Sequence, residues 1–386
     1  MKLRKIALLI VVTLCALLLV GCGSDKPAET DVSATAAPTA AAATDAPAST
    51  DAPAATSAPA QSSKVVNVYN WEDYIDPAVI AMFEAEYGIK VNYMCFTTVE
   101  DMIVQVEANP GAFDVCFPSD YIIERMIAGG MLREINYDNV PNAALTIPYL
   151  QNPSYDPGSR YSVPYMWGTV GILYNKTMIP EPERSWAILW DTQYQKQVFM
   201  LDSIRDSMGV TLKYLGHSMN TTDVPAIMAA RDKLIAQKRS GVVKAYQVDE
   251  TKDKMVAGEA ALAVMWSGDA MYAIDLNPEL DYFVPVEGSN VWVDGAVIPI
   301  TAKNPENAEL FINFLCRPDI ARMNCEYICY STPNQGAIDL MGEVYTGNHV
   351  QNPDAAILDK CEFFHDISPD FLPIYEAMWM EVKNTK

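Results

Sequence analysis

Short apolar runs alternate with longer amphipathic segments along the chain from residue 65 onward. Val65, Val66 and Val68 fit a short buried strand. The Asp76-Pro77 pair that follows fits a helix start, with an N-cap and a proline at the first helical position. The same patterns predict strands at 65–70, 89–96 and 113–117, and helices at 77–87, 99–108 and 122–128. This alternation is typical of a parallel sheet with helices on its faces.

A second set of elements follows an extended segment at 161–175, YSVPYMWGTVGILYN. Here the pattern predicts strands at 198–201, 261–266 and 296–300, and helices at 203–215, 225–237 and 305–316. There is no internal repeat of fixed period. The chain is therefore expected to be an α/β protein, long enough for two domains.

The first 21 residues have a different pattern. Lys2, Arg4 and Lys5 form a basic start, and an almost unbroken apolar run at 6–20 leads to Leu19-Val20-Gly21-Cys22. This resembles a bacterial lipoprotein signal, which implies a signal peptide at 1–21 and lipidation of Cys22. The alternative is an uncleaved anchor, but the run is short for a membrane span and ends in small residues. A lipid anchor would hold the protein on the outer face of the cytoplasmic membrane.

Residues 23–64 are rich in Ala, Pro, Thr, Ser and Asp, with recurring TDAPA and SAPA. They hold almost no large apolar residue and cannot bury enough surface to fold. We interpret residues 22–64 as the lipidated cysteine followed by a disordered linker.

The formal net charge is −22, and it becomes −25 once the basic residues of the leader are removed. Such an acidic balance argues against nucleic acid as a partner. It also steers cations toward the protein, although acidic exported proteins gain solubility from the same charge.

The positions of the cysteines do not indicate a function. Cys95 and Cys116 lie in apolar strand-like runs and are expected to be buried thiols. The pattern does not decide whether the remaining cysteines form disulfides; these are Cys316, Cys325, Cys329 and Cys361.

One junction between a strand and a helix carries unusual chemistry. In NVYNWEDYID, residues 67–76, Trp71, Glu72, Asp73 and Tyr74 separate the first strand from the first helix. Open α/β sheets bind ligands at the carboxyl ends of their strands. A carboxylate beside an aromatic ring face suits a cation. The alternative is a solvated turn with an aromatic residue at its rim.

Four other stretches share this character: FPSDY (117–121), MLDSIRDSMG (200–209), VMWSGDAM (264–271) and NVWVDGAVIPI (290–300). Ser119 and Asp120 would serve as helix N-caps, and we expect Asp202 to cap the helix whose first turn holds Asp206. Three of the five stretches place a Trp two or three residues before an Asp beside a strand end. This repetition at distant positions favours one converging site over separate turns and caps.

These strings, with RYSVPYMWGTVGILYN, SWAILWD and YSTPN, closely resemble the spermidine/putrescine-binding proteins of bacterial ABC importers. The resemblance covers almost all of residues 65–386, in order and with similar spacing. It implies a two-lobed, type II periplasmic-binding-protein fold with the polyamine in the cleft between the lobes. The implied lobes are 65–168 plus 295–340, and 169–294 plus 341–386. A permease with an ATPase is the implied partner of a monomer that needs no cofactor.

The resemblance also implies binding roles, position by position. The acids placed near amines are Asp73, Asp206, Asp269 and Asp294. The aromatic residues placed along the ligand are Trp71, Tyr74, Trp266, Trp292 and Tyr330, and Ser119 and Tyr121 would come from the same lobe as Trp71. Carboxylates at intervals between flat apolar walls match a polyamine, which is a string of cations separated by methylenes.

Two positions depart from the family pattern. Ser203 stands where spermidine-type members often carry an Asp, with Asp202 next to it. Phe364 stands where they carry a Gln. Asp269 in WSGD is more similar to the putrescine-selective members. The choice between spermidine and putrescine therefore stays open.

The sequence fits other classes of function less well. Glycosidases also combine aromatics with paired carboxylates, but Asp dominates these stretches and no G-x-S-x-G, P-loop or G-x-G-x-x-G motif occurs. His217, His349 and His365 lack metal-ligand spacing. A binding protein for ferric iron, thiamine or a quaternary amine remains an alternative. We expect a non-enzymatic binding protein.

Overall fold

A computed structural model describes residues 63–368 and 370–386 of the chain. The predicted signal peptide, the predicted lipidation at Cys22 and the linker up to residue 62 lie outside the described residues. Within the described part, no helix is long and apolar enough to cross a membrane.

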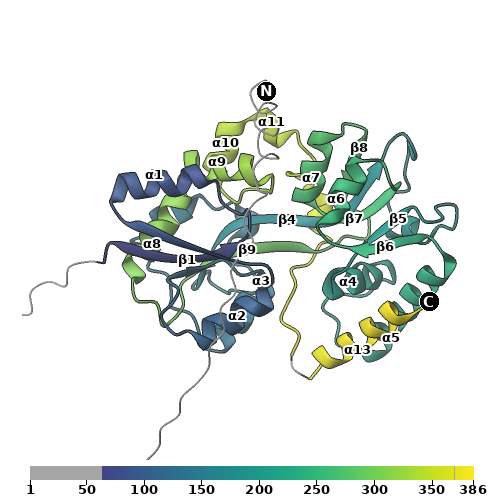
Figure 1. Cartoon of the computed structure of the whole chain (residues 1–386), viewed down its shortest axis with the longest axis horizontal. Helices are drawn as coiled ribbons and strands as arrows, with labels where there is room; N and C mark the ends of the chain where they lie inside the picture. The colour runs from purple at the N-terminus through teal and green to yellow at the C-terminus, as the bar shows by residue number, and fades with distance from the viewer. Residues whose placement is uncertain (1–62, 369) are drawn as a thin grey trace, which may run out of the picture. The chain divides into compact units, whose positions relative to one another are not determined.

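The centre of the fold is a nine-stranded mixed sheet in the order β2-β1-β3-β9-β4-β7-β5-β6, with β8 paired to β4 (Figure 1). The strands are β1 (Val65–Trp71), β2 (Lys90–Phe96), β3 (Val115–Cys116), β4 (Ser162–Asn175), β5 (Val198–Leu201), β6 (Val243–Gln247), β7 (Leu262–Trp266), β8 (Leu280–Phe283) and β9 (Val291–Val297). Pairs β1–β2, β1–β3, β5–β6 and β5–β7 are parallel, as the alternating pattern predicts. The pairs that β4 and β9 make are antiparallel, which the pattern did not predict.

Strand β4 joins the two ends of this sheet. Its first half pairs with β9, from Ser162 opposite Val297 to Thr169 opposite Val291. Its second half pairs with β7, starting with Val170 opposite Trp266. The prediction that 161–175 is extended chain leading into new material is confirmed.

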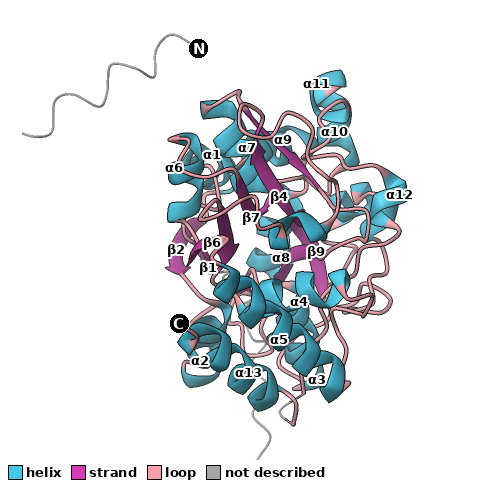
Figure 2. Cartoon of the chain, turned by 90° about the vertical axis from the view of Figure 1, so that its right-hand side faces the viewer, coloured by secondary structure: helices cyan, strands magenta, loops and turns pink. Residues whose placement is uncertain are grey.

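Helices cover both faces of the sheet, as Figure 2 shows. The α-helices are α1 (Pro77–Tyr87), α2 (Val99–Ala108), α3 (Asp120–Ala128), α4 (Ile204–Tyr214), α5 (Val224–Ser240), α6 (Glu250–Val256), α7 (Ser267–Leu276), α8 (Pro305–Leu315), α9 (Pro318–Ile328), α10 (Gln335–Met341), α11 (Glu343–Thr346), α12 (Ala355–Leu358) and α13 (Leu372–Asn384). Short 3-10 helices are η1 (Pro141–Leu145), η2 (Pro148–Leu150) and η3 (Trp186–Trp190).

The buried apolar side chains explain this layered arrangement. Successive side chains of a strand point to opposite faces of the sheet. In β1, Val68 packs in a cluster with Phe83 and Phe311, whereas Tyr69 packs in another cluster on the opposite face. In β4, Ile172 and Leu173 divide in the same way between two further clusters. Strands β1 and β4 therefore pack on both of their faces, unlike the edge strand β2, which is mostly exposed.

Helix capping agrees with the sequence at α1 and differs at α4. The Asp76 carboxylate accepts a hydrogen bond from the Ala78 amide at the start of α1, and Gly88 ends that helix in the left-handed conformation. The N-cap of α4 is Ser203, whose hydroxyl accepts from the Asp206 amide. The prediction that Asp202 caps this helix is wrong, because Asp202 lies one residue too early and pairs with Lys383 at 2.5 Å instead.

Two further expectations are corrected. The strand predicted at 296–300 is β9, which starts earlier, so Trp292 and Asp294 lie within the strand and not before it. Buried Val291 and Val293 alternate as expected for a strand. The start of the strand was nevertheless predicted too late, because Asp294-Gly295 has the composition of a turn. Cys116 is buried as expected, whereas the prediction that Cys95 is buried is wrong, because it lies near the end of the edge strand β2 and is exposed.

Candidate functional site

Three distant segments of the chain meet at the carboxylate of Asp294. The Tyr74 hydroxyl, from the turn after β1, donates to Asp294 Oδ2 at 2.7 Å. The Ser119 hydroxyl, from the residue before α3, donates to Asp294 Oδ1 at 2.7 Å. Asp294 itself lies in β9 and is only 6% exposed. Both carboxylate oxygens are therefore oriented by hydroxyl groups.

Aromatic rings stand beside this carboxylate. The ring centroid of Tyr330 lies 5.7 Å from that of Tyr74 and 5.0 Å from that of Trp292, and both pairs are edge-on. The glycine at position 268 allows this arrangement, since a Cβ there would lie 1.1 Å from a ring carbon of Tyr330. Gly168 makes room for Trp292 in the same way, with a Cβ that would lie 2.5 Å from the indole.

A second buried carboxylate, Asp206, lies in the first turn of α4. The Ser203 hydroxyl donates to Asp206 Oδ2 at 2.6 Å, and the Trp266 side chain donates a further hydrogen bond. Asp206 is 5% exposed. It repeats the device seen at Asp294, which is a buried acid held by a hydroxyl group next to an indole.

Burial disfavours the ionised form of both acids. It raises the pKa of Asp294 to about 6, against the opposing effect of the hydrogen bonds from Tyr74 and Ser119. It also raises the pKa of Asp206 to about 6, against the effects of Ser203 and the nearby Arg205 charge. Among the described residues, no Lys or Arg forms an ion pair with either carboxylate. A buried carboxylate without a cation is costly, so both positions are suited to a cationic ligand.

A third acid, Asp269, lies in the first turn of α7. Burial is the main cause that raises its pKa, and the neighbouring Asp249 adds to the shift. Unlike the first two acids, Asp269 has an ion-pair partner, the Lys252 ammonium at 3.6 Å. Burial raises the pKa of the Tyr330 hydroxyl, and the charges of Asp269 and Asp294 add to the shift.

Three predicted residues are not drawn into this group. Asp73 is exposed and adopts a left-handed backbone with φ 52°, and its charge acts on Tyr93 and Cys95. The Tyr121 hydroxyl donates to Glu100 at 3.3 Å, and its ring lies 5.5 Å from the Arg205 guanidinium. Trp71 is half-buried, with its indole donating to the Phe117 carbonyl at 3.0 Å. These residues stay predictions for the site.

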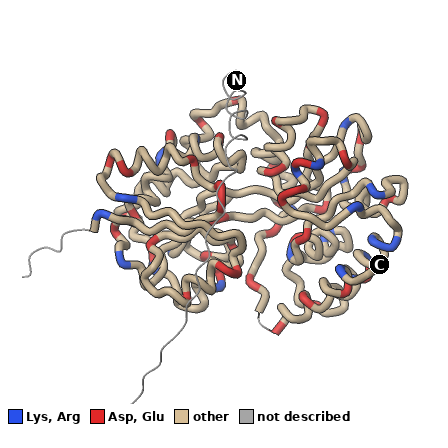
Figure 3. Tube along the Cα trace, viewed as in Figure 1, with Lys and Arg blue, Asp and Glu red and all other residues tan. Residues whose placement is uncertain are grey.

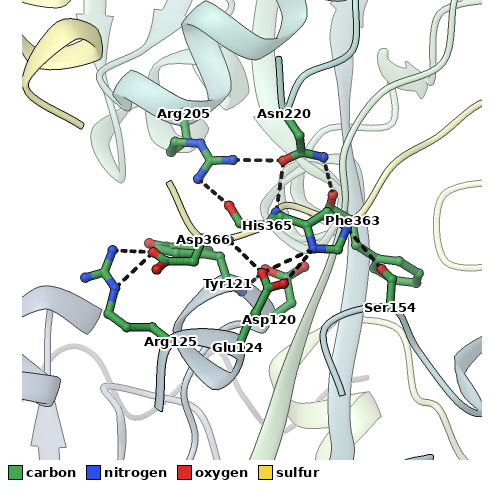
Figure 4. A network of polar contacts seen from close by, with 10 residues as sticks. All are labelled: Asp120, Tyr121, Glu124, Arg125, Ser154, Arg205, Asn220, Phe363, His365 and Asp366. Carbon is green, nitrogen blue, oxygen red and sulfur yellow. Dashed lines mark hydrogen bonds and ion pairs between the residues drawn. The ribbon is translucent and has the colours of Figure 1, made fainter. Parts of the chain in front are cut away.

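The segment 361–368, which we call the C-terminal strap, was missed by sequence reasoning except for Phe364. It runs between α3 and α4 (Figure 4). On the α3 side, Arg125 donates twice to Asp366, at 2.6 and 2.9 Å, and His365 Nδ1 lies 3.1 Å from Glu124. No local sequence motif predicts such contacts, because the partners are 241 residues apart.

On the α4 side, the strap is held through its backbone. Asn220 donates to the Phe363 carbonyl at 2.8 Å and accepts from the His365 amide at 2.9 Å. The Arg205 guanidinium donates to the His365 carbonyl at 3.0 Å and lies 4.2 Å from the ring centroid of Phe364. The departure noted at Phe364 therefore provides a buried ring for a cation of the protein itself.

Cavities elsewhere are less suited to a cation. One cavity beneath η1 is lined by Asn142, Tyr165, Cys316 and other residues without a charged side chain. A second beside it, lined by Tyr137 and Gln151 among others, also lacks charged side chains. Figure 3 shows acidic positions along the middle of the trace and many of the basic ones toward the β6 end.

Comparison with known proteins defines the class. The sequence model of the bacterial extracellular solute-binding proteins matches residues 78–352. The mixed α/β fold and the buried acids beside aromatic rings agree with that class. This is a solute-binding protein and not an enzyme.

The relatives narrow the class further. The spermidine/putrescine-binding periplasmic protein of Salmonella typhimurium is 35% identical over 317 residues, which span 82% of this chain and 90% of that protein. The protein of the same description from Escherichia coli is 34% identical over the same shares. The structure of PotD, the spermidine/putrescine ABC transporter substrate-binding protein of Streptococcus pneumoniae, is similar with a TM-score of 0.77 and 34% identity, covering 83% of this chain and 99% of that one. The chain belongs to the family of spermidine/putrescine-binding solute-binding proteins.

Replacing Asp294 with Asn should stabilise the ligand-free protein in a pH-dependent way. The folded-state pKa of about 6 exceeds the ordinary value of 3.8, so the charge destabilises the fold fully above about pH 6 and not at all well below pH 3.8. We expect D294N to raise the free energy of unfolding by about 1 kcal/mol at neutral pH. Urea denaturation at pH 7.5 and 4.5 measures this difference, which should shrink at pH 4.5. A pH-independent difference would contradict the assigned burial.

Replacing Gly268 with Ala should displace the Tyr330 ring, because the new methyl group would occupy its place. Overpacking of this kind lowers the free energy of unfolding by about 1–3 kcal/mol. The matched control is Gly209→Ala in α4, where the Cβ meets the flexible end of Met219 at 2.6 Å. Thermal denaturation of both variants tests the expectation, and equal stability of the two would refute it.

Proposed function

We propose that this protein captures spermidine or putrescine outside the membrane and delivers it to an ABC importer. The observation that carries the proposal is the pair of buried carboxylates at Asp294 and Asp206, each beside an indole and neither in an ion pair with a Lys or Arg of the described residues. The names of the relatives support a polyamine as the cation.

The chemistry of capture follows from these groups. Tyr74 and Ser119 each donate to one oxygen of Asp294, so the carboxylate is oriented before the ligand arrives. An ammonium group bound there forms a charge-assisted hydrogen bond in a place with little water. Trp292, Trp266 and Tyr330 supply apolar walls for the methylene segments, and the ring faces attract the adjacent ammonium groups. Trp71, Asp73 and Tyr121 are proposed to complete the binding surface.

The proposed cleft lies between two lobes, 65–168 plus 295–340 and 169–294 plus 341–386. Hinge closure of such lobes around a solute is a recurring motion. With these bounds, the chain passes between the lobes in β4, in β9 and at the end of α10, and these are the connections available for the hinge. Closure would bury the ligand beside Tyr330, and opening at the importer would release it.

The proposed location follows from the leader. After removal of 1–21, Cys22 would carry the lipid anchor, and the linker up to residue 64 would let a monomer reach a permease driven by an ATPase. A linker of this length, if it is a flexible coil, spans roughly 35–40 Å between its ends.

The first experiment is calorimetric titration of the chain beginning at residue 23. The protein is unfolded and refolded beforehand to remove bound solute, and its refolding is checked by circular dichroism. Spermidine, putrescine and a quaternary amine are titrated in parallel. One-to-one binding of a polyamine, with the quaternary amine at least about a hundredfold weaker, is the expected result. A folded sample that binds neither polyamine would overturn the proposal.

Polyamine binding should weaken as the pH falls through about 6. Ammonium groups pair with ionised acids, and Asp294 and Asp206 each have a pKa of about 6 in the ligand-free protein. Below that pH the dissociation constant should rise by about tenfold per pH unit for each acid that must lose a proton.

Titration at pH 7.5, 6 and 5 measures this dependence. At pH 6, buffers of different ionisation enthalpy should also reveal protons released on binding. The D294N variant serves as the control. It lacks one of the two titrating acids, so it should release fewer protons on binding. An affinity that is constant from pH 7.5 to 5 would remove these acids from the site.

A further inference from the structure

We propose that Arg205 is a built-in cation of the binding site, which limits how tightly a ligand ammonium is held at Asp206. The inference rests on the proposed function, because it assigns control of affinity at the same site to a further residue. Arg205 stabilises the empty protein by placing a positive charge near an acid without an ion-pair partner, and it repels the ammonium group that binds there.

The partners of the Arg205 guanidinium are uncharged. Nη1 donates to the His365 carbonyl at 3.0 Å, and Nη2 donates to Asn220 Oδ1 at 3.1 Å (Figure 4). The guanidinium carbon lies 4.2 Å from the ring centroid of Phe364 and 5.5 Å from that of Tyr121. Its Nε atom is buried and has no hydrogen-bond partner among the described residues. A cation held in this way is fixed in place without being neutralised.

The charged side chains of the C-terminal strap have partners other than Arg205. These contacts are His365–Glu124, Asp366–Arg125 and Glu362–Lys213. Arg205 itself meets the strap at a backbone carbonyl and an aromatic ring. The strap therefore positions the guanidinium but leaves its charge uncompensated.

Arg205 is next to the binding acid Asp206 in the chain and yet does not pair with it. Among the described residues, no carboxylate forms an ion pair with Arg205. Successive side chains of a helix point about 100° apart. Arg205 accordingly reaches the strap, whereas the Asp206 carboxylate accepts hydrogen bonds from Ser203 and Trp266. Asp206 thus lies near a positive charge that does not occupy the place of a ligand ammonium.

The titratable groups around Arg205 come from three helices. Asp206 belongs to α4, Asp120 and Tyr121 belong to α3, and Tyr375 belongs to α13. Asp120 is fully buried, and its Oδ2 atom has no partner among the described residues. Burial raises the pKa of Asp120 and that of Asp206, and the charge of Arg205 opposes the shift at both. In the empty protein, Arg205 is therefore the cation that offsets part of the cost of two buried acids.

The proton and the ligand ammonium compete for Asp206, and Arg205 opposes both. Well above the Asp206 pKa of about 6, the acid is ionised before the ligand arrives, so the repulsion between Arg205 and the ammonium lowers the affinity. Well below that pKa the ligand replaces a proton, which is one positive charge for another, and the effect of Arg205 cancels. The residue thereby narrows the free-energy difference between the empty and the filled protein at neutral pH, which favours release of the solute.

The test compares Arg205→Met with the wild-type chain by calorimetric titration of putrescine and spermidine at pH 8 and pH 5. Methionine removes the charge and keeps an apolar chain against Phe364. We expect the dissociation constant of each ligand to fall about fivefold at pH 8 and to change less than about twofold at pH 5. Arg205→Lys keeps the charge and should bind like the wild-type protein at both pH values.

A purely structural role for Arg205 predicts a different result. Loss of its hydrogen bonds would loosen the strap and weaken binding at both pH values. The matched control is Lys213→Met in the same helix, because Lys213 is paired with Glu362 of the strap at 2.5 Å. This change loosens the strap and leaves the charge of Arg205 in place, so it should not tighten binding. If Arg205→Met does not refold, Arg205→Gln removes the same charge, retains a donor amide and carries the same expectation.

Weaker or unchanged binding at pH 8 without the Arg205 charge would overturn its role. Equal tightening at both pH values, or tighter binding in Lys213→Met at pH 8, would do the same. In each of these cases wild-type binding would leave the proposed function standing, whereas a wild-type protein that binds neither polyamine would fail the proposed function itself.

Discussion

The hydroxyl groups that converge on Asp294 are the constraint on which this site depends. Tyr74 follows β1 and Ser119 follows β3, and Asp294 reaches them because β9 pairs with both β3 and β4. The fold thus brings two polar side chains to a carboxylate that would otherwise be buried without partners. The two hydrogen bonds reduce the free-energy cost of keeping the buried acid ionised, but they do not remove that cost. The cost that remains favours the binding of a cation.

The antiparallel centre of the sheet explains how one molecule can combine two parallel α/β halves. Strand β4 is long enough to serve both, with Thr169 paired to β9 and Val170 paired to β7. The residues around this change of partner are also those beside the site, since Gly168 gives room to Trp292. The same few backbone positions therefore determine both the close packing where β4 changes its partner strand and the room for the aromatic ring beside the site.

Much of the fold could be predicted from the sequence, in segments where the hydrophobic residues follow a single helix or strand periodicity. Helices such as Pro77–Tyr87 have a cap, a proline and a terminal glycine within one short stretch, and they were predicted to the residue. Strand β9 was misplaced because Asp294-Gly295 has turn composition, and only pairing with β4 makes it extended. The grouping of Trp292, Asp294 and Tyr330 followed from the family resemblance, but the contact between Lys252 and Asp269 did not. It depends on how α6 lies against α7, which no local pattern encodes.

The C-terminal strap has a mechanical consequence. It is fastened to α3 by the Arg125–Asp366 ion pair and the His365–Glu124 contact, and to α4 by the Lys213–Glu362 ion pair and the Arg205 hydrogen bond to the His365 carbonyl. Any movement that separates these two helices must release one fastening. Both fastenings include an ion pair that is partly open to water, so dissolved salt weakens both of them. The resistance of this connection to such a movement should therefore fall as the ionic strength of the surrounding solution rises.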